Sequence, residues 1–247
     1  MKNTFFAERL AGYGRGLGMD VRVVTTDDMP PGAPDCAVNR SRDWELAEKL
    51  ESDGALVSNN SETCRICNDK LLTYELADEL GIPHMPVSVL GRPLPPGPPW
   101  VIKSRGGHGG TEVMLARDEG EVADIICRIP SPIIQSMAEP GRDMRAYALG
   151  DDIMGCAMRT SRNDFRANRS LGGDAEMCGP PDGVEEIVKK VCRRLGSDLV
   201  GVDFVFLDGK PLLNEIEDAV GCRMLYSLTD LDPARLLMER VHSKMSR

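Results

Sequence analysis

The chain has 247 residues, 41% of them hydrophobic, so it is long enough to fold around its own core without disulfides or structural metals. Its 39 acidic residues outnumber its 30 lysines and arginines, and the resulting formal charge of −9 argues against general binding to nucleic acids. Residues 1–9 lack the features of a signal peptide, and no uncharged stretch approaches the ~20 residues that span a bilayer. We therefore expect a cytoplasmic protein with neither nucleic-acid nor membrane partners, and a homo-oligomer is compatible with the sequence.

The eight cysteines are scattered along the chain and do not resemble the disulfide framework of a small secreted protein. Cys64 and Cys67 form a CxxC motif, but no second pair of cysteines or histidines stands at the spacing of a zinc site, which needs about four ligands. We interpret these two cysteines as helix residues with reduced thiols.

Residues 1–59 predict a small α/β domain. Apolar residues at helical spacing indicate a helix over 5–17, and Val21 to Val24 follow as a predicted strand. A second strand is expected at 37–38, a helix at 44–50 and a further strand at 55–57. An α/β domain usually opens with a strand, whereas this chain begins inside a helix, so its N-terminal sheet is expected to lack the first strand.

In the rest of the chain, the predicted secondary structure changes after a proline-rich linker. Asp69 caps the start of a predicted helix over 69–80. Five prolines between residues 92 and 99 then predict a stiff connection. Beyond it, hairpins predominate. The expected strands cover 100–103, 111–115, 133–135, 144–149, 153–160, 202–207 and 212–216, and the expected helices cover 184–195 and 233–242.

A glycine-rich loop follows one of these strands. Lys103 ends the strand, and Gly106, Gly107, Gly109 and Gly110 surround His108. Glycines let backbone N–H groups approach an anion closely, so the loop suits a polyphosphate. It lacks the GK[ST] ending of a P-loop and the context of a dinucleotide fingerprint. Taken alone, the loop is equally compatible with a flexible hairpin.

Three carboxylates are predicted to converge near the end of the chain. Glu215 and Glu217 are two residues apart in a strand and so share one face, and the turn at Asp208-Gly209 brings them opposite Asp203. Three hard oxygen donors of like charge favour a Mg²⁺ site. The alternative is a solvated strand face with chance acidic spacing.

The joint order of these features resembles the ATP-grasp superfamily, and within it the RimK-like ligases that join glutamate or a related amino acid to a carboxylate. The resemblance covers about residues 60–245. The matching stretches are Cys67-Asn68-Asp69-Lys70-Leu71-Leu72, Val101-Ile102-Lys103 with its glycine loop, Pro140-Gly141-Arg142-Asp143-Met144-Arg145, Asp164-Phe165-Arg166-Ala167-Asn168 with Gly172-Gly173, Gly201-Val202-Asp203 and Asn214-Glu215-Ile216-Glu217.

The resemblance implies a fold and a nucleotide site. Two α+β lobes, about 60–135 and 136–247, would grip ATP behind the 1–59 domain. Lys70 and Lys103 would contact the phosphates, and the loop from Gly106 to Gly110 would close over them. The remaining expected ATP contacts are Gln135, Ser136, Met137 and Ala138 at the hinge for adenine, Asp143 for the ribose, and Arg145 and Asn168.

The resemblance also assigns Asp203, Glu215 and Glu217 to Mg²⁺, which Mn²⁺ can replace. The family usually has asparagine where this chain has Glu217, and the extra charge is expected to tighten metal binding. The usual Ser-Pro-Gly that follows is here Ala219-Val220-Gly221. This loop borders the acceptor pocket, so the resemblance does not define that pocket.

The implied reaction joins a small-molecule or peptide carboxylate to the amine of an amino acid through an acyl phosphate. Arg166 is the best candidate to stabilise the oxyanion, and Arg159 is a second, with a surface arginine on a hairpin as its alternative role. Two other functions remain open from the sequence: an ATP-grasp kinase that phosphorylates a small molecule, and an ATP-binding regulatory module without turnover.

Overall fold

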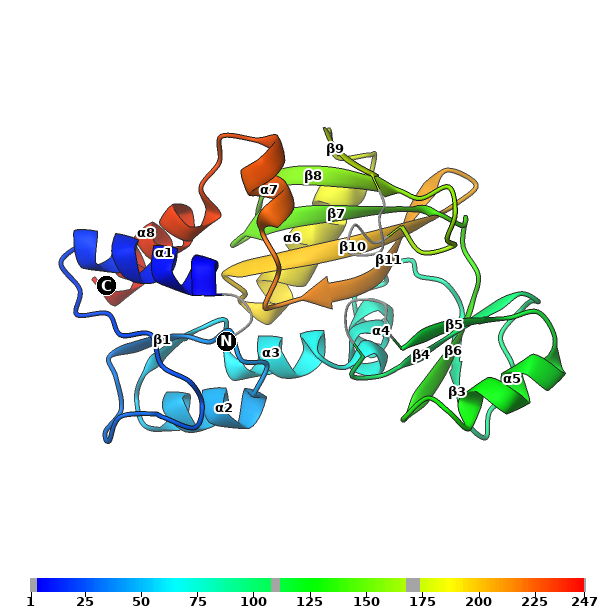
Figure 1. Ribbon diagram of the computed structural model, residues 1–247, viewed down its shortest axis with the longest axis horizontal. Helices are drawn as coiled ribbons and strands as arrows, with labels where there is room; N and C mark the ends of the chain where they lie inside the picture. The colour runs from blue at the N-terminus through cyan, green and yellow to red at the C-terminus, as the bar shows by residue number, and fades with distance from the viewer. Residues whose placement is uncertain (1–3, 108–111, 168–173, 247) are drawn as a thin grey trace.

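The computed structural model describes residues 4–107, 112–167 and 174–246, which form three sheets arranged along the long axis of the molecule (Figure 1). At one end lies a parallel pair, β1 (Cys36–Val38) and β2 (Leu56–Ser58). A five-stranded antiparallel sheet occupies the centre, and a four-stranded antiparallel sheet lies at the other end (Figure 1).

The central sheet separates an apolar face from a charged face. Its strands, in the order β11-β10-β7-β8-β9, are β11 (Lys210–Glu217), β10 (Leu199–Leu207), β7 (Arg142–Leu149), β8 (Asp152–Thr160) and β9 (Asp174–Cys178). Met144, Ala146, Val202 and Phe204 pack in one core with helix α6 (Val184–Leu195). Because side chains alternate along a strand, the intervening polar residues of β7 and β10 face the opposite side.

The four-stranded sheet has the order β3-β6-β4-β5 and forms its own core with helix α5 (Glu119–Ile126). Its strands are β3 (Val87–Val89), β6 (Pro132–Ser136), β4 (Trp100–Ser104) and β5 (Val113–Ala116). Residues 137–141 connect β6 directly to β7 and therefore join the two antiparallel sheets.

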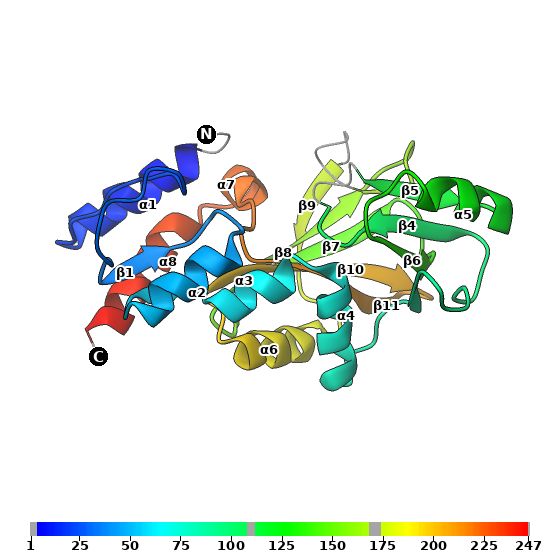
Figure 2. The same cartoon turned by 90° about the horizontal axis from the view of Figure 1, so that it is seen from below.

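Helices α3 (Ser61–Cys67) and α4 (Lys70–Glu79) lie beside the central sheet, and Figure 2 shows them next to α6. Ile66, Cys67, Leu76 and Ala77 belong to the same core as the sheet and α6. Both CxxC cysteines are buried in α3, which confirms their interpretation as helix residues, and all eight cysteines are free. Within the described residues, no helix is both long and apolar enough to span a membrane.

The N-terminal helix α1 (Thr4–Gly16) packs against the C-terminal helix α8 (Pro233–Met245), while α2 (Trp44–Ser52) covers the parallel pair. The predicted strand at Val21 to Val24 is wrong. Val23 and Val24 are 37% and 39% exposed, and the segment pairs with no other strand of the described chain. The sequence prediction also missed α5, β9 and α7 (Arg223–Leu228).

Candidate active site

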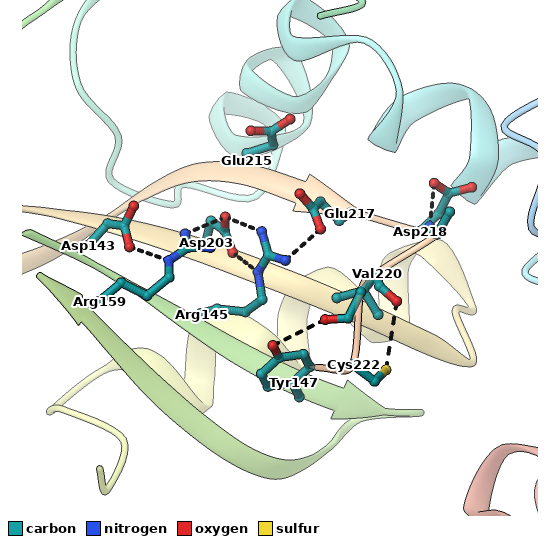
Figure 3. A network of polar contacts seen from close by, with 12 residues as sticks. Asp143, Arg145, Tyr147, Arg159, Asp203, Glu215, Glu217, Asp218, Val220 and Cys222 are labelled. Atoms are coloured by element: carbon teal, nitrogen blue, oxygen red, sulfur yellow. Dashed lines mark hydrogen bonds and ion pairs between the residues drawn. The ribbon is translucent and has the colours of Figure 1, made fainter. Parts of the chain in front are cut away.

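The charged face of the central sheet carries a continuous network of arginines and carboxylates (Figure 3). Strand register sets it up: Asp203 on β10 lies opposite Arg145 on β7 and opposite Glu215 on β11, while Asp143 on β7 lies opposite Arg159 on β8. Four neighbouring strands thus place charged groups on one surface, where they can bind one another or a charged ligand.

Asp203 and Glu217 are both held by Arg145. The Nε and Nη2 atoms of Arg145 each donate to one carboxylate oxygen of Asp203 at 2.7 Å, and its Nη1 lies 2.7 Å from Oε2 of Glu217. Burial alone would raise the pKa of Asp203, but the guanidinium groups outweigh burial and lower it to about 2. For Glu217, burial raises the pKa by more than the charge of Arg145 lowers it, so the pKa is raised.

Arg159 is buried, which rules out the alternative role of a surface arginine on a hairpin. Its Nη2 donates to Asp203 at 2.9 Å, and its Nε donates to Asp143. Burial raises the pKa of Asp143 although Arg159 opposes the change. Asp143, predicted to bind a ribose, is therefore a partner of Arg159 in this structure.

The side chain of Lys103 is buried beside this network. Its Nζ donates to the hydroxyl of Tyr74 at 2.9 Å and to Oδ1 of Asn214 at 3.0 Å. Neither partner is a carboxylate, and burial lowers the pKa of Lys103 to about 8, with Glu215 opposing. Among the described residues this buried ammonium has only neutral hydrogen-bond partners, so it is poised to attract an anion.

Lys70 reaches the same region from the start of α4. Its Nζ lies 3.0 Å from Oε1 of Glu215 and donates to the carbonyl of Gly107. Arg105, at the base of the glycine loop, is tied to Asp69 through its Nε at 3.0 Å and its Nη2. The start of α4 is thereby fastened to the loop that follows Lys103.

Tyr74 is a site residue that the sequence prediction missed. Its hydroxyl accepts hydrogen bonds from Lys103 and from Nε2 of Gln135 at 2.9 Å, and it donates to the carbonyl of Asn214 at 2.9 Å. It joins both sheets through these contacts. The available signal was its position four residues after Lys70, because residues at that spacing share one face of a helix.

The predicted adenine segment lies where the two sheets are joined. Gln135 and Ser136 are buried at the end of β6, and Met137 and Ala138 begin the connection to β7. The backbone N–H groups of Ser136 and Met137 donate to the carbonyls of Pro86 at 2.9 Å and Pro99 at 3.3 Å. The segment therefore occupies a hinge position, and its contact with adenine stays a prediction.

Arg166 and the glycine loop complete the candidate site. Arg166 donates to Asp164 through Nε at 3.0 Å and Nη2 at 2.7 Å, and its side chain is 25% exposed. Gly106 and Gly107 are in the described part of the loop. The other predicted residues, His108, Gly109, Gly110 and Asn168, lie outside the described residues.

The carboxylates suit a divalent cation in donor type and in charge. Asp143, Asp203 and Glu217 face two guanidinium groups, so the network retains one excess negative charge, and burial raises the pKa of Asp143 and Glu217. The arrangement itself differs from a three-carboxylate cluster, because arginines hold both oxygens of Asp203. Over residues 4–107, 112–167 and 174–246, no three His, Cys, Asp or Glu side chains form a group that could hold a metal.

The lowered pKa of Lys103 predicts a pH-dependent contribution to stability. Between about pH 8 and the ordinary lysine pKa of 10.5, the unfolded chain binds a proton at this position that the folded chain has lost. Stability attributable to Lys103 should therefore rise with pH in that window. We expect the melting temperature of the parent, relative to that of Lys103→Met, to increase as the pH is raised from 7.5 to 10, measured without nucleotide. A constant difference would contradict the assigned shift.

Comparison with known proteins gives consistent matches. The family model of the RimK-like ATP-grasp domain matches residues 95–241. The chain is 28% identical over 217 residues to the glutamate–LysW ligase ArgX of Sulfurisphaera tokodaii, covering 80% of this chain and 77% of that protein. It is 26% identical over 252 residues to N-acetylaspartylglutamate synthase A of Homo sapiens, covering 94% of this chain and 64% of that protein.

Solved structures share the fold at lower sequence identity. The ATP-grasp ligase PsnB complexed with a minimal precursor superposes with a TM-score of 0.73 at 14% identity, covering 100% of this chain and 97% of that one. The D-alanine–D-alanine ligase from Bacillus anthracis complexed with ATP gives a TM-score of 0.65 at 19% identity, covering 85% and 81%. The two antiparallel sheets and their connection are thus a known arrangement.

Proposed function

This chain belongs to the RimK-like ATP-grasp family and is an ATP-dependent carboxylate–amine ligase, and we propose that glutamate or a related amino acid supplies the amine. The relatives named as glutamate ligases support this choice of substrate. The carboxylate would come from a small molecule or a peptide. We also propose a cytoplasmic location, where eight free cysteines stay reduced.

The observation that carries the proposal is the convergence of two buried lysines on one strand of the central sheet. Lys70 contacts Glu215, and Lys103 contacts its neighbour Asn214, although the lysines come from different elements. We assign both to the ATP phosphates, with the glycine loop above them. Adenine would lie at residues 135–138. Arg145 and Asp143 would border the nucleotide while keeping their partners within the network.

Glu215 and Glu217 are the carboxylates best placed to hold Mg²⁺ or Mn²⁺. Their side chains are 19% and 30% exposed, and within the part of the chain that the structure describes each is paired with a single cation, whereas Asp203 is 6% exposed and is paired with two. Asp203 would then act mainly by holding Arg145 and Arg159 in place. A bound divalent cation would supply charge neutralisation for the phosphates.

The chemistry requires two anions to react. The substrate carboxylate attacks the γ-phosphorus of ATP and ADP leaves, and the amine then attacks the acyl phosphate and expels inorganic phosphate. Lys70 and Lys103 would reduce the repulsion between carboxylate and nucleotide in the first step. Arg166 would stabilise the oxyanion of the second step, because it is partly exposed whereas Arg159 is buried between two aspartates.

The direct test uses hydroxylamine to intercept the acyl phosphate. The protein is incubated with ATP, Mg²⁺, hydroxylamine and a pool of amino acids and short peptides as carboxylate donors. We expect ADP, phosphate and a hydroxamate, and a new amide when hydroxylamine is omitted and free amino acids are present. A phosphorylated product that survives hydroxylamine, or ADP without any hydroxamate or amide, would contradict ligase chemistry.

A further inference from the structure

The hydroxyl of Tyr74 connects helix α4 to both antiparallel sheets. It accepts from Lys103 on β4 and from Gln135 on β6, and it donates to the backbone carbonyl of Asn214 on β11, each at 2.9 Å. The side chain of Tyr74 is buried, and its ring centre lies 5.0 Å from that of His84. The phenol is therefore held in place by its ring and by three hydrogen bonds.

The direction of each of these hydrogen bonds follows from the groups involved. A carbonyl can only accept, so the single proton of the phenol is donated to Asn214, and an ammonium can only donate. Burial raises the pKa of Tyr74, so the phenol keeps its proton. Toward Lys103, the oxygen of Tyr74 acts as an acceptor.

Lys103 is held by two neutral acceptors. Its Nζ donates to the hydroxyl of Tyr74 at 2.9 Å and to Oδ1 of Asn214 at 3.0 Å. An ammonium has three N–H donors, and within the residues that the structure describes the third has no hydrogen-bond partner. Because the three N–H bonds point in tetrahedral directions, fixing two of them also fixes the third. The buried ammonium thus offers one uncommitted donor in a defined direction.

Without the phenol oxygen, the ammonium would be held at one point at the end of a flexible four-carbon stem and could rotate about that bond. We propose that Tyr74 is a positioning residue for nucleotide binding: its hydroxyl and Oδ1 of Asn214 hold two N–H groups of Lys103 so that the third donates to a phosphate oxygen of ATP. This inference rests on the proposed function, because it requires Lys103 to bind ATP. It assigns a role to a residue that acts on the nucleotide through another side chain.

A double-mutant cycle tests this role without turnover. The parent, Tyr74→Phe, Lys103→Met and the double variant are compared in their affinity for a non-hydrolysable ATP analogue with Mg²⁺. Phenylalanine keeps the ring and removes only the hydroxyl. We expect Tyr74→Phe to bind the analogue about 10-fold more weakly, as for the loss of a hydrogen bond to a charged group. In the Lys103→Met background the same change should alter affinity by less than about 2-fold, because the group that Tyr74 positions is absent.

A second variant and a matched control accompany the cycle. Asn214→Leu removes the other side-chain acceptor of Lys103 but retains the backbone carbonyl to which Tyr74 donates, so it should also weaken binding only when Lys103 is present. Tyr226→Phe removes a partly buried hydroxyl that donates to Asp232 at 2.9 Å, and it should bind the analogue like the parent. Thermal melting checks that every variant is folded.

Adenosine separates an effect on the phosphates from an effect on the predicted adenine segment, since Tyr74 also contacts Gln135. Adenosine has no phosphate, so the parent and Tyr74→Phe should bind it alike. Parental affinity of Tyr74→Phe for the analogue, equal losses for the analogue and adenosine, or the same loss with and without Lys103 would each overturn the role of Tyr74. Hydroxamate formation by the parent is measured independently of this cycle, so the two proposals can fail separately.

Discussion

Lys103→Met is expected to lower ATP turnover by about 100-fold or more while the protein remains folded. The ammonium of Lys103 is buried and is bound to two neutral oxygens, from Tyr74 and Asn214, so its charge is available for a phosphate. Methionine fills a similar volume without the charge. Loss of one donor to a developing anion typically costs about 10²-fold to 10³-fold in rate. The measurement is ADP release under the conditions that support the parent.

The matched control is Lys210→Met, which removes an exposed lysine at the start of β11. It should retain the parental rate. Circular dichroism and thermal melting should show that both variants are folded, so that lost turnover is assigned to the site. Parental turnover by Lys103→Met would remove this lysine from the nucleotide site and weaken the proposed position of the phosphates.

Most of the fold could be predicted because its elements carry a strong period. Helix α6 and strands β7, β8 and β10 have apolar residues at helical or alternating spacing, and all appear where expected. Val21 to Val24 has the composition of a strand but no strand beside it, and pairing is a property of the partner as much as of the segment. The short helices α5 and α7 form but were not predicted, because eight and six residues give a weak periodic signal.

The ordered motifs predict the candidate site residues, but they do not predict the partners of those residues. The sequence places Asp203, Glu215 and Glu217 on adjacent strands, and the register between β10 and β11 agrees. It contains no information on which cation lies on the neighbouring strand, and Arg145 and Arg159 come from β7 and β8, more than forty residues away. Hence the three carboxylates that suggested a bare metal cluster are paired with cations in the structure, Asp203 and Glu217 with arginines and Glu215 with Lys70.

Arg145→Met is expected to lower the free energy of unfolding by about 3–5 kcal/mol without nucleotide or Mg²⁺, the usual range for breaking a buried ion pair. The side chain of Arg145 is 9% exposed and holds both Asp203 and Glu217. Its removal leaves Asp143, Asp203 and Glu217 with Arg159 alone, which doubles the excess negative charge. Urea unfolding measures the change. Arg193→Met, which breaks an exposed pair with Asp151, should cost less than about 1 kcal/mol.

Mg²⁺ provides the second half of this test. If Glu215 and Glu217 hold a divalent cation, that cation replaces some of the charge lost with Arg145, so Mg²⁺ should raise the melting temperature of Arg145→Met more than that of the parent. Mn²⁺ should act in the same way, and Arg193→Met should respond like the parent. Because melting is read without ATP, the result does not depend on turnover. An equal response of the parent and Arg145→Met to both metals would show that the network is a structural ion-pair cluster, and the cation would then have to be held elsewhere.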